Sequence, residues 1–146
     1  MENQQTSFLK SLQIIFGALF MGQILAAIVF YVFLTPPPSL EKNVELVTIF
    51  PLIALSLTVA AYFLFNSRRK IWLAESDLDA RKGSYRLASL LKWAIFEGTT
   101  LMALVGYLVF GENVFFFTAL ASILHFALHF PSRERLISDL QTDEID

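Results

Sequence analysis

Three residues that can hold a proton or a ligand lie inside apolar stretches of this sequence. Glu97 is the one carboxylate within residues 87–110, and Gly98 follows it at once. His125 and His129 are four positions apart in a second apolar stretch, so a helix would bring them to one face. A charge at the centre of a bilayer costs about 2.5–3.5 kcal/mol on insertion scales, which makes Glu97 the first candidate for a functional site.

Three interpretations of Glu97 compete. In the first, which we favour, a protonated or hydrogen-bonded Glu97 holds packed helices together. In the second, Glu97 binds a proton or an ion. In the third, Glu97 binds a metal or a cofactor together with His125 and His129, because histidines at this spacing can share a metal ion. We assign no metal and no cofactor, since His129 is also near the membrane boundary. In the first interpretation, the partners would be polar side chains at a similar depth: Gln23, Thr99, Thr100 and His125.

The composition is typical of a membrane protein. Hydrophobic residues make up 55% of the chain and charged residues 16%, with 15 Phe among the 146 residues. A soluble domain would be about 45–50% apolar and about 25% charged. The absence of Cys excludes disulfides and thiolate metal sites. The net charge of −2 gives no reason to expect a nucleic-acid partner.

The apolar residues fall into four runs, each near the length of about 20 residues that a membrane-spanning helix needs. We therefore predict an all-α membrane protein with one integral domain, residues 1–146. A proline turn at 36–38 ends the first helix, and a turn at 111–113 makes the third and fourth helices antiparallel neighbours. Between the helices we expect a cytoplasmic loop at 67–84, part of it an interfacial helix, and after them a solvated tail at 131–146. The four predicted helices are 12–34, 47–65, 87–110 and 114–130.

Positive charges predict the orientation. Nearly every Lys and Arg falls on one side of the four helices, and only Lys42 falls on the other. By the positive-inside rule, both termini are then cytoplasmic. We expect some of these cations to contact lipid phosphates at the cytoplasmic face: Arg68, Arg69, Lys70, Arg86 and Lys92.

The first and third runs align without gaps at an offset of 76 residues, which suggests an internal repeat. Two tandem antiparallel hairpins, related by an axis along the membrane normal, would follow. Gly22 and Gly98 are equivalent in this alignment, and Gly17 and Gly106 lie in the same two runs. We expect these four glycines to let helices pack closely. The matched residues are Ala18, Phe20, Gly22, Leu25, Ala27, Val29 and Tyr31 with Ala94, Phe96, Gly98, Leu101, Ala103, Val105 and Tyr107.

Short sequences in the second half resemble a family of small, uncharacterised bacterial membrane proteins with four predicted helices. They are the pattern YR-x-A…KWA-x-x-EG at 85–98, the turn at 111–113 and PSRER at 131–135. This resemblance implies a bacterial membrane and brings no function with it. Tandem hairpins with a mid-membrane Glu are also similar in topology to the proteolipid (c) subunits of rotary ATPases. Two features differ from that family. Proteolipid helices are rich in Gly and Ala, whereas this chain has 6 Gly in total, and their Glu usually lies in the second helix of a hairpin, whereas Glu97 lies in the first.

These observations lead to one expected function and two alternatives. We expect a non-enzymatic protein of the bacterial inner (cytoplasmic) membrane, surrounded by lipid. It would be an accessory or structural subunit that forms a homo-oligomer or joins another membrane protein. The first alternative is a small proton- or ion-translocating protein that uses Glu97. The second, which we expect least, is a membrane enzyme or cofactor carrier built on His125 and Glu97.

Overall fold

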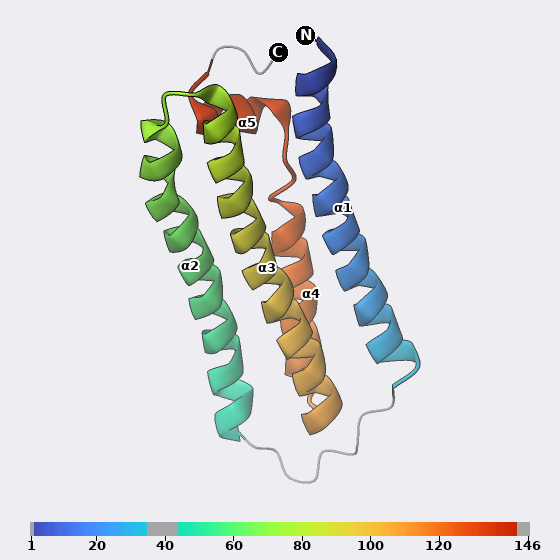
Figure 1. The fold of residues 1–146 in the computed structure, drawn as a ribbon. Helices are drawn as coiled ribbons and strands as arrows, with labels where there is room; N and C mark the ends of the chain where they lie inside the picture. Colours follow the sequence, from blue (N-terminus) through green and yellow to red (C-terminus); the bar gives the residue numbers. More distant parts are fainter. Residues whose placement is uncertain (1, 35–43, 143–146) are drawn as a thin grey trace.

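The computed structural model describes residues 2–34 and 44–142, and all regular structure in these ranges is helical. The predicted proline turn at 36–38 and Lys42 lie outside the described residues. The helices are α1 (Glu2–Val32), α2 (Val44–Ala74), α3 (Leu78–Phe110), α4 (Asn113–Ala127) and α5 (Arg133–Leu140), as Figure 1 shows.

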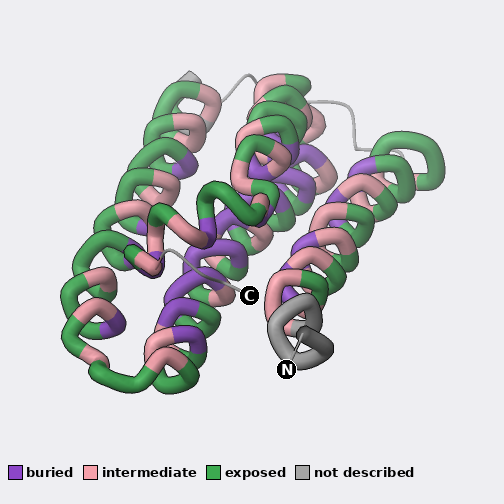
Figure 2. The backbone as a smooth tube through the Cα atoms, turned by 90° about the horizontal axis from the view of Figure 1, so that it is seen from above, coloured by how far each residue is buried: buried purple, intermediate pink, exposed green. Residues whose placement is uncertain are grey.

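The four long helices alternate in direction, and α5 lies across the end where α1 begins (Figure 1). Helices α3 and α4 occupy the middle, while α1 and α2 pack on opposite sides of them (Figures 1 and 2). In the described chain, α1 and α2 therefore do not pack against each other as a hairpin. The predicted antiparallel pairing of α3 with α4 is confirmed. Their turn is closed by Gly111, whose φ of 69° suits glycine and whose N–H donates to Tyr107 O at 2.9 Å.

Three helices are long and apolar enough to cross a membrane, judged by length and composition. These stretches are Phe8–Val32, Val47–Ala74 and Leu78–Phe110. Helix α4 has 15 residues and spans about 22 Å, at 1.5 Å per residue, against a hydrocarbon thickness of about 30 Å. The fourth predicted helix is thus shorter than expected, because regular helix stops at Ala127 rather than at residue 130.

The predicted loop at 67–84 is mostly helix, so that prediction was wrong. Helix α2 continues through this segment to Ala74, and Trp72 is fully buried rather than interfacial. Helix α3 starts at Leu78, where the Asp77 carboxylate accepts a hydrogen bond from Ala80 N at 3.0 Å. Pro51 is inside α2, which begins at Val44.

The predicted solvated tail is also partly wrong. Helix α5 begins after Ser132, whose hydroxyl accepts a hydrogen bond from Arg135 N at 3.3 Å. Leu136 and Leu140, one turn apart, are buried on the ends of α2 and α3. The indole N–H of Trp72 donates to Asp139 O at 3.1 Å. A folded cap of eight residues therefore closes this end of the bundle.

The core has two parts of different composition. Near α5 it is rich in aromatic residues; Phe16 of α1 stacks on Phe126 of α4 with ring centroids 4.5 Å apart. At the other end it is built from Ala27, Ala103, Ala119 and larger aliphatic residues. Buried positions lie on the inward sides of the helices and exposed positions on the outward sides (Figure 2). The exposed side chains include many large apolar ones, as a bilayer would require.

Candidate functional site

Tyr62, His125 and His129 form a hydrogen-bonded cluster between α2 and the end of α4. The Tyr62 hydroxyl lies 3.3 Å from His125 Nε2 and also bonds His129 Nε2. His129 Nδ1 lies 2.9 Å from the carbonyl oxygen of His125 and donates to it, since a carbonyl only accepts. His129 Nε2 then accepts the Tyr62 proton, and the Tyr62 oxygen accepts from His125 Nε2–H. The three groups form a chain that could pass a proton or simply hold α2 to α4.

Aromatic rings and one buried cation, Lys92, surround this cluster. The Phe96 ring of α3 lies 5.2 Å from the His125 ring and 5.1 Å from the His129 ring, measured between centroids. Lys92 is 8% exposed, and its Nζ lies 3.9 Å from the centroid of the Phe65 ring. Lys92 acts electrostatically on both histidines. The expectation that Lys92 reaches lipid phosphates is therefore not met, because the side chain turns inward for a cation–π contact.

The segment after α4 leaves the helix inside the bundle, and its carbonyls are satisfied by side chains from elsewhere. Arg135 Nη1 donates to Leu128 O at 3.1 Å and to Phe130 O at 3.5 Å. Gln13 Nε2 of α1 donates to Pro131 O at 3.1 Å. In a bilayer, irregular backbone is tolerated where other groups satisfy it. Arg135 and Gln13 therefore explain how the chain can break its helix at this depth.

Gln23 is deeply buried between α1 and α3, and its partner is Thr100. The Thr100 hydroxyl donates to Gln23 Oε1 at 3.0 Å and also lies 3.1 Å from Phe96 O. The Nε2 of Gln23 has no hydrogen-bond partner among the described residues, and neither has the buried Nε1 of Trp93. The predicted polar contact between helices thus exists, but it joins Gln23 to Thr100.

Glu97 is half-buried and makes no hydrogen bond or ion pair with any described residue. The Glu97–His125 contact, which the sequence allowed, is absent from the described structure. On α3, Glu97 follows Trp93 by four residues and precedes Thr100 by three, and both of these contact α1. Its other flank is the exposed row that contains Ala94, Gly98 and Leu101. The carboxyl therefore sits where the α1–α3 contact meets the outer surface.

Of the four glycines expected at close helix contacts, one has such a contact in the described chain. A Cβ built on Gly106 would lie 2.7 Å from Phe115 Cδ1, so α3 and α4 approach closely there. Nothing lies within 4 Å of a Cβ at Gly17, Gly22 or Gly98. The prediction fails at these three within the chain, because Gly22 and Gly98 face outward and Gly17 has open space beside it.

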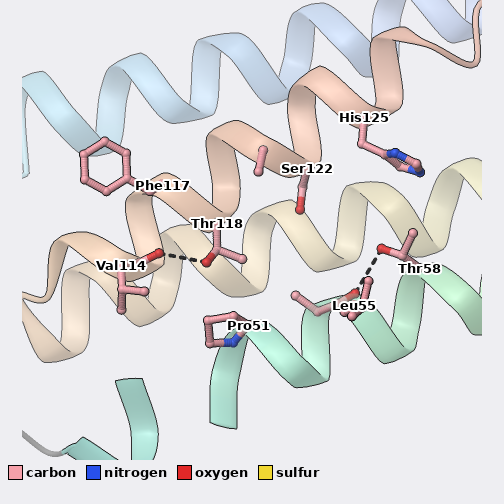
Figure 3. A pocket seen from close by; sticks show the side chains of 10 residues that line it. Pro51, Leu55, Thr58, Val114, Phe117, Thr118, Ser122 and His125 are labelled. Atoms are coloured by element: carbon pink, nitrogen blue, oxygen red, sulfur yellow. Dashed lines mark hydrogen bonds between the residues drawn. The ribbon is translucent and has the colours of Figure 1, made fainter. Parts of the chain in front are cut away.

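A groove of about 550 Å³ runs between α2 and α4 (Figure 3). Pro51, Ala54, Leu55 and Thr58 line it from α2. The Thr58 and Thr118 hydroxyls donate to carbonyls of their own helices. Ser122 points from α4 into the groove and makes no hydrogen bond with a described residue. The lining from α4 is Val114, Phe117, Thr118, Ala121, Ser122 and His125.

A second groove of about 420 Å³ lies between the starts of α1 and α3. Lys10, Ser11 and Arg86 line it together with Ile14 and Ile15. The contact of Arg86 with lipid phosphate stays a prediction. Arg68 and Lys70 are exposed on α2, and Arg69 is partly buried. Among the described residues, no group of three or more His, Cys, Asp or Glu side chains is placed to hold a metal ion.

Three residues of the site were missed at the level of sequence: Tyr62, Gln13 and Arg135. Tyr62 and Gln13 lie in predicted helices, and Arg135 lies in the predicted solvated tail. A signal existed for the tail, since Leu136 and Leu140 are spaced by four and Ser132 is a good N-cap.

Comparisons with protein-family models, with curated proteins and with solved structures found no match to this chain.

Proposed function

We propose that this protein crosses the bacterial inner (cytoplasmic) membrane four times and serves as a non-enzymatic accessory or structural subunit. It would self-associate or join a larger membrane complex, with both termini in the cytoplasm. The path of the chain supports four crossings: three would leave the ends on opposite sides, yet the start of α1 and α5 lie at one end (Figure 1). Helix α4 plus residues 128–131 would make the fourth crossing.

Two contacts support the proposed repeat. Phe16 packs on Trp93 with ring centroids 5.3 Å apart, and Gln23 bonds Thr100. Each pair is separated by 77 residues, close to the offset of 76 in the sequence alignment. Equivalent residues of α1 and α3 would therefore lie at nearly the same depth in parallel helices. This is the relation expected for parallel repeats, although α1 and α2 do not pack as α3 and α4 do.

The observation that carries the proposal is the position of Glu97. Its carboxyl has no partner among the described residues, and the row beside it is open and contains Gly98. A polar group without a partner in hydrocarbon is costly, and a glycine on an outer helix face permits close approach of another helix. A second polypeptide on this face would supply both the hydrogen bond and the packing.

The mass of the particle in native lipid tests this proposal. We expect wild-type protein, extracted with its lipid by a polymer, to be larger than one 16.5 kDa chain. Gly98→Leu should release single chains, because it fills the outer face without disturbing the fold. Gly83→Leu is the matched control: it is also an open glycine on α3, but close to the helix start. A wild-type particle with one copy of this chain and no other polypeptide would contradict the proposal.

Proton or ion translocation is the second candidate, and the α1–α3 boundary gives it a specific basis. Glu97 has no hydrogen-bond partner among the described residues. The buried donors Gln23 Nε2 and Trp93 Nε1 also lack one, and they lie on either side of Glu97 along the helix axis. Of these groups, the Glu97 carboxyl is the one that can gain and lose a proton, and the two N–H groups could donate hydrogen bonds to a water molecule that carries it. Flux into liposomes that is abolished by Glu97→Gln would favour this function. Absence of flux in wild-type liposomes would remove it.

A further inference from the structure

We propose that the partner of Glu97 is a second copy of this chain, and that the Glu97 face of one copy occupies the α2–α4 groove of the next. The inference rests on the proposed self-association and names its contact. The groove ends at His125, and small or hydroxyl-bearing residues line it together with larger apolar ones. The first kind are Ala54, Thr58, Thr118, Ala121 and Ser122, and the second kind are Pro51, Leu55, Val114 and Phe117. It has room for a helix edge, and it offers hydrogen-bonding groups where the carboxyl of a neighbour would lie.

The depths of the two surfaces agree. Glu97 follows Phe96 directly, so the two differ in height by about 1.5 Å along the helix axis. The Phe96 ring lies 5.2 Å from the His125 ring in the same copy. Copies related by an axis along the membrane normal keep the same depth. Glu97 of one copy therefore lies level with His125 of its neighbour, and Gly98 lies near the level of Ser122, one turn from His125 on α4.

The chemistry of the two surfaces is complementary. Glu97 brings a carboxyl without a partner. The groove offers the Ser122 hydroxyl, which makes no hydrogen bond with a described residue and can donate to the carboxyl. It also offers His125 Nδ1, which can accept the proton of a neutral carboxylic acid, because Nε2–H of this imidazole donates to Tyr62. No other described acidic side chain lies in the middle of a membrane-spanning stretch.

The two surfaces lie on different sides of the molecule. Glu97 is at the boundary with α1, whereas the groove is formed by α2 and α4 alone, and α1 and α2 are on opposite sides of the bundle (Figures 1 and 2). A contact between two different surfaces is head-to-tail, and its repetition about the membrane normal gives a ring where the rotation between copies divides a full turn. We therefore infer a cyclic assembly rather than a two-fold dimer.

Cysteine cross-linking in membranes tests the contact, since the natural chain has no Cys. The double variant Gly98→Cys/Ser122→Cys should form a ladder of multimers on mild oxidation. Gly98→Cys alone and Ser122→Cys alone should remain uncross-linked, but they should form dimers when two differently tagged single variants are co-expressed. The matched control is Gly98→Cys/Leu124→Cys, because Leu124 is exposed on α4 outside the groove. All variants are compared with wild type in thermal unfolding.

Each result decides one of the two proposals. A ladder that forms from the 98/122 pair and not from the 98/124 pair supports the groove contact. Dimers from Gly98→Cys alone, or a folded double variant without cross-links in particles that hold several copies, would overturn the groove contact and keep self-association. A second kind of polypeptide in the native particle would overturn the inference while keeping the accessory role. Particles of a single chain would overturn both.

A thermodynamic cycle gives a second readout. Glu97→Leu and Ser122→Ala should each weaken association by about 5- to 30-fold, as the loss of an interhelical hydrogen bond does in a bilayer. The double variant should be little weaker than either single one, because the two changes remove the same contact. Independent, multiplying effects of the two substitutions would show that Glu97 and Ser122 do not meet.

Discussion

The hydroxyl of Thr100 on α3 donates to the Oε1 of Gln23 on α1 at 3.0 Å, and both side chains are fully buried. This contact lies less than one turn from Glu97, at the depth where the sequence indicated a polar site. The interaction that joins α1 to α3 therefore does not use the carboxyl. Glu97 is left at the edge of the contact, and this position is the basis of the proposed association.

The first prediction concerns Thr100. Thr100→Val should destabilise the protein by about 1–2 kcal/mol, because Gln23 then loses its hydrogen-bond partner in a buried site. Thr99→Val is the matched control, since the Thr99 hydroxyl is equally buried but donates to Ile95 O of its own helix. Thermal unfolding in detergent measures the difference. Equal losses in the two variants would mean that the bond between α1 and α3 contributes nothing of its own.

The second prediction separates the glycines. Gly106→Ala should destabilise the protein by about 1–3 kcal/mol, because the new Cβ would overlap the Phe115 ring. Gly22→Ala should be neutral or stabilising by up to about 1 kcal/mol, since its surroundings are open and Ala favours helix. Unfolding of the dissociated chain in detergent is the measurement. A loss at Gly22 as large as that at Gly106 would place a contact where the structure has none.

The third prediction concerns the cap formed by α5. Leu136→Ser should expose residues 133–140 to proteolysis and to rapid hydrogen exchange, because this buried leucine holds α5 on α2 and α3. Tyr85→Phe should have a smaller effect, since it removes one hydrogen bond, from the hydroxyl to Asp139 Oδ2 at 3.1 Å. Glu134→Ala, on the exposed side of α5, serves as the control. Rapid exchange of α5 already in the wild-type protein would contradict the docked cap.

The fourth prediction concerns the end of α4. Arg135→Met should speed amide exchange in residues 128–130, because the carbonyls of Leu128 and Phe130 lose their donor. Arg135→Lys should restore little of the protection, since one ammonium group does not reproduce the planar guanidinium. The matched control is Arg68→Met, an exposed arginine on α2. Unchanged exchange in Arg135→Met would show that other groups support this segment.

The fifth prediction assigns the proton on His129. Its Nδ1 donates to His125 O, so Nε2 must carry the lone pair that accepts from Tyr62. Nitrogen NMR of the labelled imidazoles should show the Nδ1–H tautomer at His129. In Tyr62→Phe, the Nε2 resonance should move to the position of a nitrogen without a hydrogen-bond donor. An Nε2–H tautomer in the wild-type protein would reverse the direction of the hydrogen-bond chain.

Much of the fold was readable from hydrophobic runs, because lipid-facing helices need long apolar stretches. The third predicted helix ends at Phe110 as α3 does, and the short turn after it gives the expected neighbours. Two of the errors, the loop at 67–84 and the tail at 131–146, came from charged segments. Trp72 and Leu136 stand among charges, and their burial depends on a docking surface that several elements form together.

The candidate site was harder to predict than the fold. The sequence identified polar residues at mid-membrane depth. Their hydrogen-bond partners depend on the rotation of each helix about its axis, which a sequence pattern determines only to within a wide range of angles. Gln23 and His125 were predicted as partners of Glu97, yet Gln23 bonds Thr100 and His125 bonds Tyr62. The glycines failed likewise: an outward and an inward glycine look the same in an apolar run, and only Gly106 faces another helix of the chain.

The surroundings of Glu97 in native lipid test the central claim most directly. A structure determined from lipid particles, without prior detergent purification, would show what lies against the carboxyl. We predict a second polypeptide within hydrogen-bonding distance, and in particular Ser122 or His125 of a neighbouring copy. A carboxyl surrounded by acyl chains, in a particle with a single chain, would contradict the proposed association and leave Glu97 to be explained by proton or ion handling.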